Sequence, residues 1–262
     1  MPFSDLSRIR TEAPLVHNIT NYVVMNVTAN ALLAVGASPV MAHAVEEVEE
    51  MVGLAQALVL NIGTLSGPWI DAMLVAGRAA RRRGIPVVLD PVGSGATRYR
   101  TATALRLIEE VAPTILRGNA SEIASLMSDA GGTKGVDSTR ASEETVAHAQ
   151  ALAARWNCMV VVSGATDAIV GEGKVLRVRN GHPMMARVTG MGCTASALVA
   201  AFAAVNPSPL RAAAHAMAVM GIAGEMAAEC AEGPGSFQPH FLDALSRLGE
   251  TDVNRRLRLE QA

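Results

Sequence analysis

The sequence has few aromatic residues for its length. Its 262 residues include four Phe, two Trp and two Tyr, although hydrophobic residues make up 50% of the chain. Small and aliphatic residues dominate instead, and they favour close packing of helices on a sheet. The length is sufficient for one large α/β domain or two small ones.

Cysteine is also scarce. Cys158, Cys193 and Cys230 are odd in number and widely spaced, and no C-x-x-C pair or Cys/His cluster is present. The pattern therefore indicates no structural zinc site and favours a reducing compartment, so we expect a cytoplasmic protein. Charged residues near the start, among them Asp5 and Arg8, exclude a secretory signal peptide.

The chain has no large excess of charge and no long uninterrupted apolar run. Its formal net charge is −2, so nothing indicates a surface for nucleic acid. The strongly apolar stretch from Cys193 to Cys230 is broken by Pro207 and Pro209 and never reaches the ~20 residues of a membrane span. We interpret it as two buried helices and expect no membrane partner.

Two common nucleotide-binding motifs are missing. The pattern G-x-x-x-x-G-K-[ST] does not occur, which excludes a P-loop enzyme. Gly93-Ser94-Gly95 does not complete G-x-G-x-x-G, which argues against a dinucleotide-binding fold.

Short apolar runs alternate with helical patterns along the chain. This alternation predicts an α/β fold in which a mostly parallel central sheet carries helices on both faces. No linker or repeat divides the sequence, so we expect a single domain over residues 1–262, with an exposed loop at 130–142 and a polar, solvated tail from about 249. Residues 167–178 predict a hairpin.

Five of the apolar runs end in small or polar residues. These endings are Asn61-Ile62-Gly63, Asp90-Pro91, Arg117-Gly118-Asn119, Ser163-Gly164 and Thr189-Gly190. In open α/β sheets, ligands bind beyond the carboxyl ends of the strands. We therefore expect these side chains to meet on one rim of the sheet.

The run A-R-V-T-G-M-G-C-T-A-S-A at 186–197 places Gly190 and Gly192 before a long apolar helix. The N–H groups and partial positive charge of a helix start could form an anion hole. The alternative is a Gly-rich turn that packs a helix on the sheet. Cys193 lies in the first helical turn, where a lowered pKa could make it a base or nucleophile; otherwise it is a small residue tolerated near a ligand.

Two carboxylates fall on the predicted rim. Asp90 and Glu122 could together hold Mg²⁺, which is typically bound by one or two carboxylates plus substrate phosphates. Asp90 could instead cap a turn, and Glu122 could be a first-turn acid favoured by the helix dipole. Asn119 is better interpreted as a helix N-cap than as a ligand.

Several other polar residues have two interpretations. Arg117 could clamp a phosphate or form a surface ion pair, and Ser163 could bind a nucleotide or stabilise a turn. Asn21 is interpreted as a cap that could also touch substrate. Met41 is better interpreted as a core residue than as part of a substrate-binding wall. His17 is interpreted as a hydrogen-bonded structural residue.

Six stretches, weak individually, resemble one family when they are read together in order. They are P-L-V-H-N-I-T-N (14–21), G-A-S-P-V-M-A (36–42), L-N-I-G-T-L (60–65), V-L-D-P-V-G-S-G-A-T (88–97), R-G-N-A-S-E-I (117–123) and V-T-G-M-G-C (188–193). The sequence resembles the hydroxyethylthiazole kinases, of the ribokinase-like superfamily, over most of the chain to about residue 205.

The resemblance implies a thiamine-salvage enzyme that phosphorylates the hydroxyl of 4-methyl-5-(2-hydroxyethyl)thiazole with ATP and Mg²⁺. It implies roles for individual residues: Met41, Gly190, Asn21 and Gly63 at the thiazole, Arg117 and Ser163 at ATP, and Asp90 and Glu122 at the metal through its waters. Cys193 occupies the place of the aspartate base of related kinases, with Gly190 and Gly192 in the anion hole. The family is typically a homotrimer with active sites between subunits.

One departure from the family pattern is Met191, where the family usually has Thr. A hydroxyl contact to substrate would be lost, while the backbone N–H is kept. Rival interpretations are a kinase for hydroxymethylpyrimidine or pyridoxal, a nucleotide-dependent hydrate dehydratase, a ligand-binding protein without catalysis, and an acyl transferase that uses Cys193 as nucleophile.

Overall fold

The computed structural model describes residues 1–127 and 140–261. The loop predicted at 130–142 therefore lies largely outside the described residues, and its last three residues begin helix α7. None of the helices within the described ranges combines the length and apolar character needed to cross a membrane.

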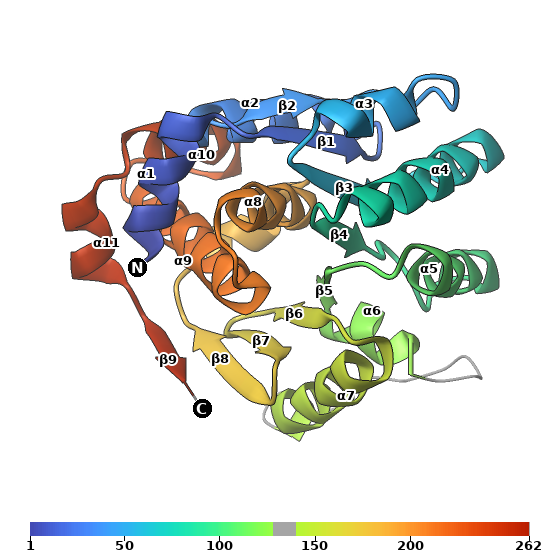
Figure 1. Cartoon of the computed structure of the whole chain (residues 1–262). Coiled ribbons are helices and arrows are strands. Elements are labelled where there is room, and N and C mark those ends of the chain that lie inside the picture. Colours follow the sequence, from blue (N-terminus) through green and yellow to red (C-terminus); the bar gives the residue numbers. More distant parts are fainter. Residues whose placement is uncertain (128–139, 262) are drawn as a thin grey trace.

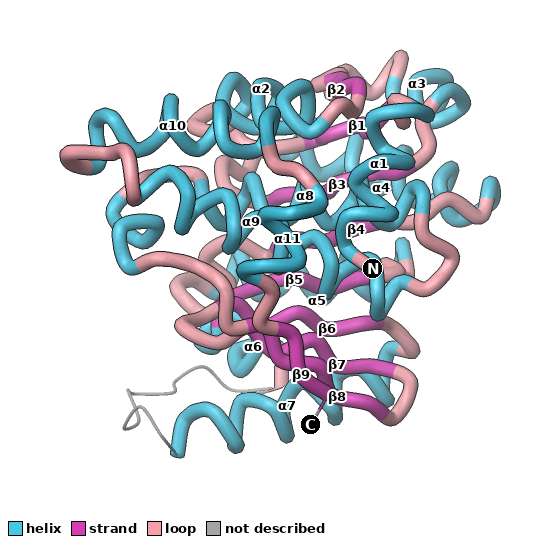
Figure 2. The backbone as a smooth tube through the Cα atoms, turned by 90° about the vertical axis from the view of Figure 1, so that its left-hand side faces the viewer, coloured by secondary structure: helices cyan, strands magenta, loops and turns pink. Residues whose placement is uncertain are grey.

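Within the described ranges, nine strands form one sheet in the order β2-β1-β3-β4-β5-β6-β7-β8-β9. Their bounds are β1 (Leu15–Ile19), β2 (Ser38–Val40), β3 (Ala57–Asn61), β4 (Val87–Asp90), β5 (Ile115–Asn119), β6 (Met159–Ser163), β7 (Asp167–Gly171), β8 (Lys174–Val178) and β9 (Leu259–Gln261). The pairs from β2 to β6 are parallel, and the last three pairs are antiparallel. The predicted mostly parallel sheet and the 167–178 hairpin are confirmed, and the sheet forms a continuous band from β2 to β9 (Figure 2).

Helices cover both faces of the sheet, as the alternation of patterns predicted (Figure 1). One face carries α3 (Val48–Leu54), α4 (Gly67–Arg83), α5 (Arg98–Val111), α6 (Ala120–Ser125) and α7 (Arg140–Trp156). The other carries α1 (Pro2–Glu12), α2 (Met25–Val35), the short 3₁₀ turn η1 (Pro183–Arg187), α8 (Met191–Val205), α9 (Pro209–Ala228), α10 (Pro234–Arg247) and α11 (Glu250–Arg256).

Strand β3 supplies apolar side chains to both faces of the sheet. Its side chains alternate, so that Ala57 and Val59 join the core under α8 while Leu58 and Leu60 join the core under α4. All four are at most 1% exposed. A strand covered on both faces needs a continuous apolar run, and this explains why the sequence shows no polar alternation here.

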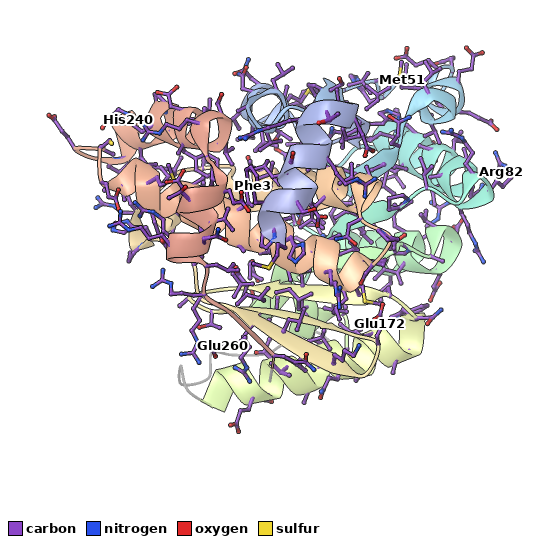
Figure 3. The ribbon with its side chains drawn as sticks, turned by 60° about the vertical axis from the view of Figure 1, so that its left-hand side comes forward. Phe3, Met51, Arg82, Glu172, His240 and Glu260 are labelled. Carbon is purple, nitrogen blue, oxygen red and sulfur yellow. The ribbon has the colours of Figure 1, made fainter. Side chains whose placement is uncertain are left out.

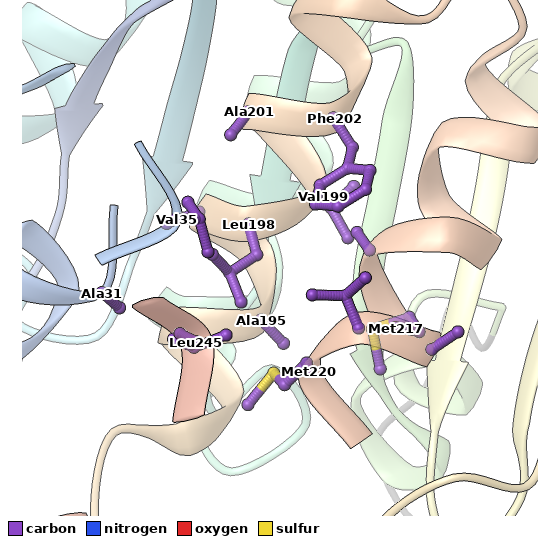
Figure 4. Packing of buried hydrophobic residues seen from close by; sticks show 14 of the residues in the cluster. Ala31, Val35, Ala195, Leu198, Val199, Ala201, Phe202, Met217, Met220 and Leu245 are labelled. Carbon is purple, nitrogen blue, oxygen red and sulfur yellow. The ribbon is translucent and has the colours of Figure 1, made fainter. Parts of the chain in front are cut away.

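Helix α8 lies at the centre of one layer and is buried around almost its whole circumference. Leu198, Val199 and Phe202 are fully buried, and Figure 4 shows them packed between Val35 of α2 and Met217 of α9. The many alanines of α8 let its neighbours approach closely. The apolar stretch from Cys193 to Cys230 is thus two buried helices, as expected.

Many charged side chains lie on the outside of the molecule. Arg82, Glu172 and Glu260 are exposed and point away from the layers (Figure 3). Cys158 is buried, Cys230 is exposed and Cys193 is partly buried, and all three are free thiols.

The segment from about 249, predicted as a polar, solvated tail, is largely exposed and also carries regular secondary structure. Residues 250–256 form α11, in which Val253 is fully buried, and β9 pairs antiparallel with β8. The side chain of Asn180 fastens this segment: its Nδ2 donates to the Arg256 carbonyl at 2.8 Å, and its Oδ1 accepts from the Arg258 N–H at 2.8 Å. The high content of Arg did not indicate that this segment would be ordered by a few apolar and backbone contacts.

Candidate active site

The carboxyl ends of the parallel strands bring the predicted residues to one rim. Asn61 ends β3 and Asp90 ends β4, side by side in register. Strand β5 runs on to Asn119, so Arg117 lies within the strand and pairs with Val161 rather than opening a loop. A strand position holds the arginine more firmly than the predicted loop would.

A chain of buried hydrogen bonds links three of these strand ends. The Nδ2 of Asn21 donates to Asn61 Oδ1 at 2.8 Å, and the Nδ2 of Asn61 donates to Asp90 Oδ2 at 3.0 Å. Asn21 also donates to the Cys193 sulfur at 3.4 Å, and Ser196 on α8 donates to Asp90 Oδ2 at 2.7 Å. Residues after β1, β3 and β4 are therefore tied directly to the first two turns of α8.

The Asp90 carboxyl group is almost fully buried. Burial raises its pKa to about 6, and the Arg117 guanidinium, 3.8 Å from Asp90 Oδ2, is the strongest of the groups that oppose this rise. Asn61 and Ser196 both donate their hydrogen bonds to Oδ2, while Oδ1 accepts from no residue in the described part of the chain. Oδ1 thus keeps its capacity to accept a hydrogen bond from a ligand or a metal-bound water.

Glu122 occupies the first turn of α6 with both carboxylate oxygens engaged. Oε1 accepts from the Gly93 N–H at 2.9 Å and Oε2 from the Asn119 N–H at 2.8 Å. Asn119 in turn accepts from the Glu122 N–H, which completes a capping box and confirms the predicted N-cap. Glu122 therefore joins the turn after β4 to the end of β5.

The start of α8 requires glycine at two positions. Gly190 has a φ of +84°, and a Cβ there would lie 3.0 Å from a Val24 methyl group. A Cβ on Gly192 would lie 2.8 Å from Arg117 Nη1. The first helical hydrogen bond runs from Thr194 N–H to the Gly190 carbonyl, so the N–H groups of residues 191–193 have no partner inside the helix.

Cys193 departs from its expected electrostatics. We expected the helix start to lower its pKa, but burial and the nearby Asp90 carboxylate raise the pKa to about 11. Desolvation of the thiolate and like charge outweigh the opposing hydrogen bonds. At neutral pH the group is a thiol, which weakens the interpretation of Cys193 as a base or nucleophile.

A cavity of about 580 Å³ opens on the other side of the α8 start. Arg117, Ser163 and Gly192 line it, and Arg117 Nη2 donates to the Ser163 hydroxyl at 2.6 Å. Four methionines contribute to its wall, namely Met185, Met191, Met217 and Met220. Met191 thus faces this cavity, whereas Asn21 and Cys193 do not line it.

Gly63 and Met41 lie toward the β2 edge of the rim. A Cβ on Gly63 would be 2.5 Å from Asn21 Nδ2, so only glycine fits against that asparagine. Met41 directly follows β2, is half-buried and does not line the 580 Å³ cavity. His17 Nε2 is 2.8 Å from the Ala42 carbonyl, in agreement with a structural role.

Three residues with clear places in the site were not singled out from the sequence. Asn61 was visible only as the end of an apolar run, and Ser196 stands inside an apolar helix with no local signal. Asp167 was read as the start of a hairpin, yet it is buried beside the cavity and accepts from the Gly164 N–H at 3.0 Å. Burial raises its pKa to about 7.

The fold and the residues of the rim together define a structural class of protein. A ribokinase-like superfamily protein from Enterococcus faecalis V583 superimposes with a TM-score of 0.64 at 15% identity, over 92% of this chain and 89% of that one. At this identity the likeness shows the fold alone. The molecule has the ribokinase-like α/β fold. The first N–H groups of α8, which have no partner within the helix, lie between the Asn21–Asn61 pair and the 580 Å³ cavity.

The chain belongs to the hydroxyethylthiazole kinase family, whose model matches residues 6–251. The hydroxyethylthiazole kinase of Syntrophus aciditrophicus (strain SB) is 64% identical over 96% of this chain and 93% of its own length. The structure of the Pyrococcus horikoshii OT3 hydroxyethylthiazole kinase protein matches with a TM-score of 0.93 at 43% identity, over 100% of this chain and 98% of that one. The resemblance seen in the six sequence stretches is confirmed.

Proposed function

We propose that the enzyme transfers the γ-phosphoryl group of ATP directly to the hydroxyl of 4-methyl-5-(2-hydroxyethyl)thiazole, as a step of thiamine salvage. Family membership supports the substrates. The observation that carries the mechanism is the order of residues along the rim. Asn21 and Gly63 lie on the β1–β3 side, Asp90 at the centre, and Arg117 with Ser163 beside the cavity.

This order supports an in-line transfer. The thiazole would lie on the side of Asn21, Gly63, Met41 and Gly190, and the nucleotide would fill the 580 Å³ cavity with its phosphates on Arg117 and Ser163. The transferring group would pass the N–H groups of residues 190–193, which carry the positive end of α8. Phosphoryl transfer depends mainly on positioning and electrostatics, so this geometry supplies most of what it needs.

Mg²⁺ fits the centre of this arrangement. Asp90 Oδ1 has no hydrogen-bond partner among the described residues, and Glu122 is fixed on the neighbouring turn. No group of three or more His, Cys, Asp and Glu side chains in the described ranges is placed to hold a metal. The ion would therefore depend on ATP phosphates as ligands, with Asp90 and Glu122 acting through its waters. Bound there, it neutralises phosphate charge.

Cys193 is proposed to border the acceptor hydroxyl as a thiol. A pKa of about 11 leaves it protonated at neutral pH, so it does not withdraw the proton before transfer. In a loose transition state the acceptor proton leaves late, and a base is then not required.

We also propose a homotrimer. Apolar side chains are exposed around the β2 end of the sheet: Tyr22, Val23, Leu33, Val45 and Leu54 are between 43% and 65% exposed. Strand β2 is the edge strand of this region, and exposed apolar residues beside an edge mark an interaction surface. Subunit contacts there would lie next to Met41 and Asn21, which would place the active sites between subunits.

Light scattering after gel filtration tests the assembly. The wild-type protein should elute with the mass of three chains, and Leu33→Asp should reduce it to one. Tyr99→Asp, an equally exposed apolar position on α5, is the control and should leave the mass unchanged. A monomeric wild-type protein would overturn the trimer.

The activity is tested by ADP release from ATP and Mg²⁺ with hydroxyethylthiazole, hydroxymethylpyrimidine, pyridoxal or no acceptor. We expect release with hydroxyethylthiazole. Release with another alcohol alone would keep the site and change the substrate. No release by a folded protein that binds ATP would reject the proposed kinase activity.

A further inference from the structure

Arg100 reaches three backbone carbonyl groups at the rim, although no motif in the sequence singles it out. It stands in the first turn of α5, where its own N–H donates to the capping hydroxyl of Thr97 at 3.2 Å. Its Nη1 donates to the Ile62 and Val92 carbonyls and its Nη2 to the Gly63 carbonyl, all at 2.8 Å.

These contacts begin where the sheet stops. The last ladder bond between the two segments runs from the Ile62 N–H to the Asp90 carbonyl at 3.2 Å. Beyond it the chains diverge into the turns after β3 and β4, whose carbonyls have no strand partner. Arginine presents five N–H donors in a planar fork, so one side chain can bind both turns at once.

Both turns carry active-site residues. Gly63 packs against Asn21 on the acceptor side, and the Gly93 N–H donates to Glu122 on the cation side. Gly93 has a φ of +73°, and a Cβ there would lie 3.2 Å from Arg100 Cδ. The stem of Arg100 thus packs against the turn after β4, while its head group binds both turns.

We infer that Arg100 is a positioning residue that fixes the distance between the acceptor-binding turn and the cation-binding turn. It touches no substrate and acts through the Ile62–Gly63 and Val92–Gly93 backbones. The inference rests on the proposed acceptor and cation sides of the site. In-line transfer is sensitive to such spacing, since a misplacement of about 1 Å can cost roughly 10²-fold in rate.

The inference predicts a particular division of kinetic effects. Arg100→Ala should lower kcat about 10- to 100-fold and raise the KM for hydroxyethylthiazole. The KM for ATP should rise less than the KM for hydroxyethylthiazole, because the proposed nucleotide cavity itself is built from β5, β6 and the α8–α9 layer. A loss of folded protein would reduce the apparent kcat and leave both KM values unchanged.

Two further variants sharpen the result. Arg100→Lys keeps the charge and stem but loses the fork, so it should fall between the wild type and Arg100→Ala. Arg106→Ala is the matched control, because Arg106 lies about two turns further along α5 and pairs with the partly exposed Glu110 at 2.8 Å. It should leave kcat and both KM values unchanged.

Hydrogen–deuterium exchange provides a readout that does not depend on activity. Amides of the turns at 62–66 and 92–96 should exchange faster in Arg100→Ala than in the wild type or Arg106→Ala. Unchanged exchange in both turns, or equal changes in the two KM values, would overturn the inference. If the wild type shows no acceptor-dependent ADP release, the proposed function fails, while exchange still tests whether Arg100 holds the turns.

Discussion

The two sides of the α8 start are built in different ways. On the proposed acceptor side, Asn21, Asn61 and Gly63 are joined by short buried contacts, and a single methyl group on Gly63 would collide with Asn21. On the proposed nucleotide side, a cavity of about 580 Å³ is lined by several methionines and by Arg117. Methionine adapts its shape easily, whereas a buried polar network admits few arrangements.

The difference teaches where selectivity should lie. A site whose buried polar groups must be paired rejects ligands that leave them unpaired, whereas an apolar wall discriminates weakly. We therefore expect strict choice of the alcohol and looser choice of the nucleotide base. Substitutions of single residues test this contrast, beginning with Asp90, which lies between the two sides.

Asp90→Asn should have the largest effect. It removes the charge at the centre while keeping the shape, and we expect kcat to fall about 10²- to 10³-fold, in the range found when one preorganised electrostatic group is lost. A Mg²⁺ titration at saturating ATP should show weaker activation. Asp71→Asn, an exposed carboxylate on α4, is the control. Wild-type Mg²⁺ dependence in Asp90→Asn would remove Asp90 from the cation side.

The same residue predicts the acid limb of the pH profile. Because the pKa of Asp90 is raised to about 6, the carboxyl is ionised above that pH and protonated below it. Activity should therefore be lost as the pH falls through about 6, and the fall should be absent in the residual activity of Asp90→Asn. A wild-type profile that stays flat down to pH 5 would contradict an essential Asp90 charge.

Arg117→Lys should weaken ATP binding selectively. The lysine keeps the charge but cannot reproduce the planar fork, so the KM for ATP should rise about tenfold or more, as a charge-assisted hydrogen bond contributes about 1.5–3 kcal/mol. Steady-state kinetics with each substrate varied in turn would measure this. An equal rise in the KM for hydroxyethylthiazole would show that the two sides are not separate.

Cys193→Ala should have a smaller effect. General-base catalysis typically contributes about 10²- to 10⁴-fold, and a thiol with a pKa of about 11 supplies little of it at neutral pH. We expect kcat to stay within about tenfold of the wild type, and Cys193→Asp to keep substantial activity. Complete loss in Cys193→Ala, with folding and ATP binding intact, would mean that the thiol is essential.

Met191→Thr should have the smallest effect and sharpens the assignment of the two sides. Met191 is 7% exposed and lines the nucleotide cavity. The change should alter the KM for ATP a few-fold and leave that for hydroxyethylthiazole unchanged, with a loss of about 1–2 kcal/mol in the free energy of unfolding. A change confined to the thiazole KM would place residue 191 on the acceptor side.

Strand ends were the part of the site that sequence reasoning could reach. Asp90 and Arg117 end or follow apolar runs, and parallel strands bring such positions to one rim. Ser196 could not be found this way, because its value depends on the contact between α8 and β4. The pKa of Cys193 was misjudged because burial depends on the whole layer, whereas the helix position is local.

The same distinction applies to the fold. The order of helices and strands follows from local periodicity, which the chain shows clearly from β1 to β8. The helix α11 and the strand β9 could not be predicted, because they are ordered by single contacts such as Val253 in the core and Asn180 with Arg256. The hydrogen bond from Asn180 to Arg256 joins residues 76 positions apart, and no local pattern records it.

The fastening of Asn180 has a consequence for the biosynthesis of the enzyme. Asn180 lines the 580 Å³ cavity, yet its amide is held by the backbone of Arg256 and Arg258. Residues 256 and 258 are synthesised after every residue of the proposed acceptor side, so this wall of the cavity gains its support late. A nascent chain would therefore contain the residues of the proposed thiazole-binding rim before the support of the proposed nucleotide cavity is available.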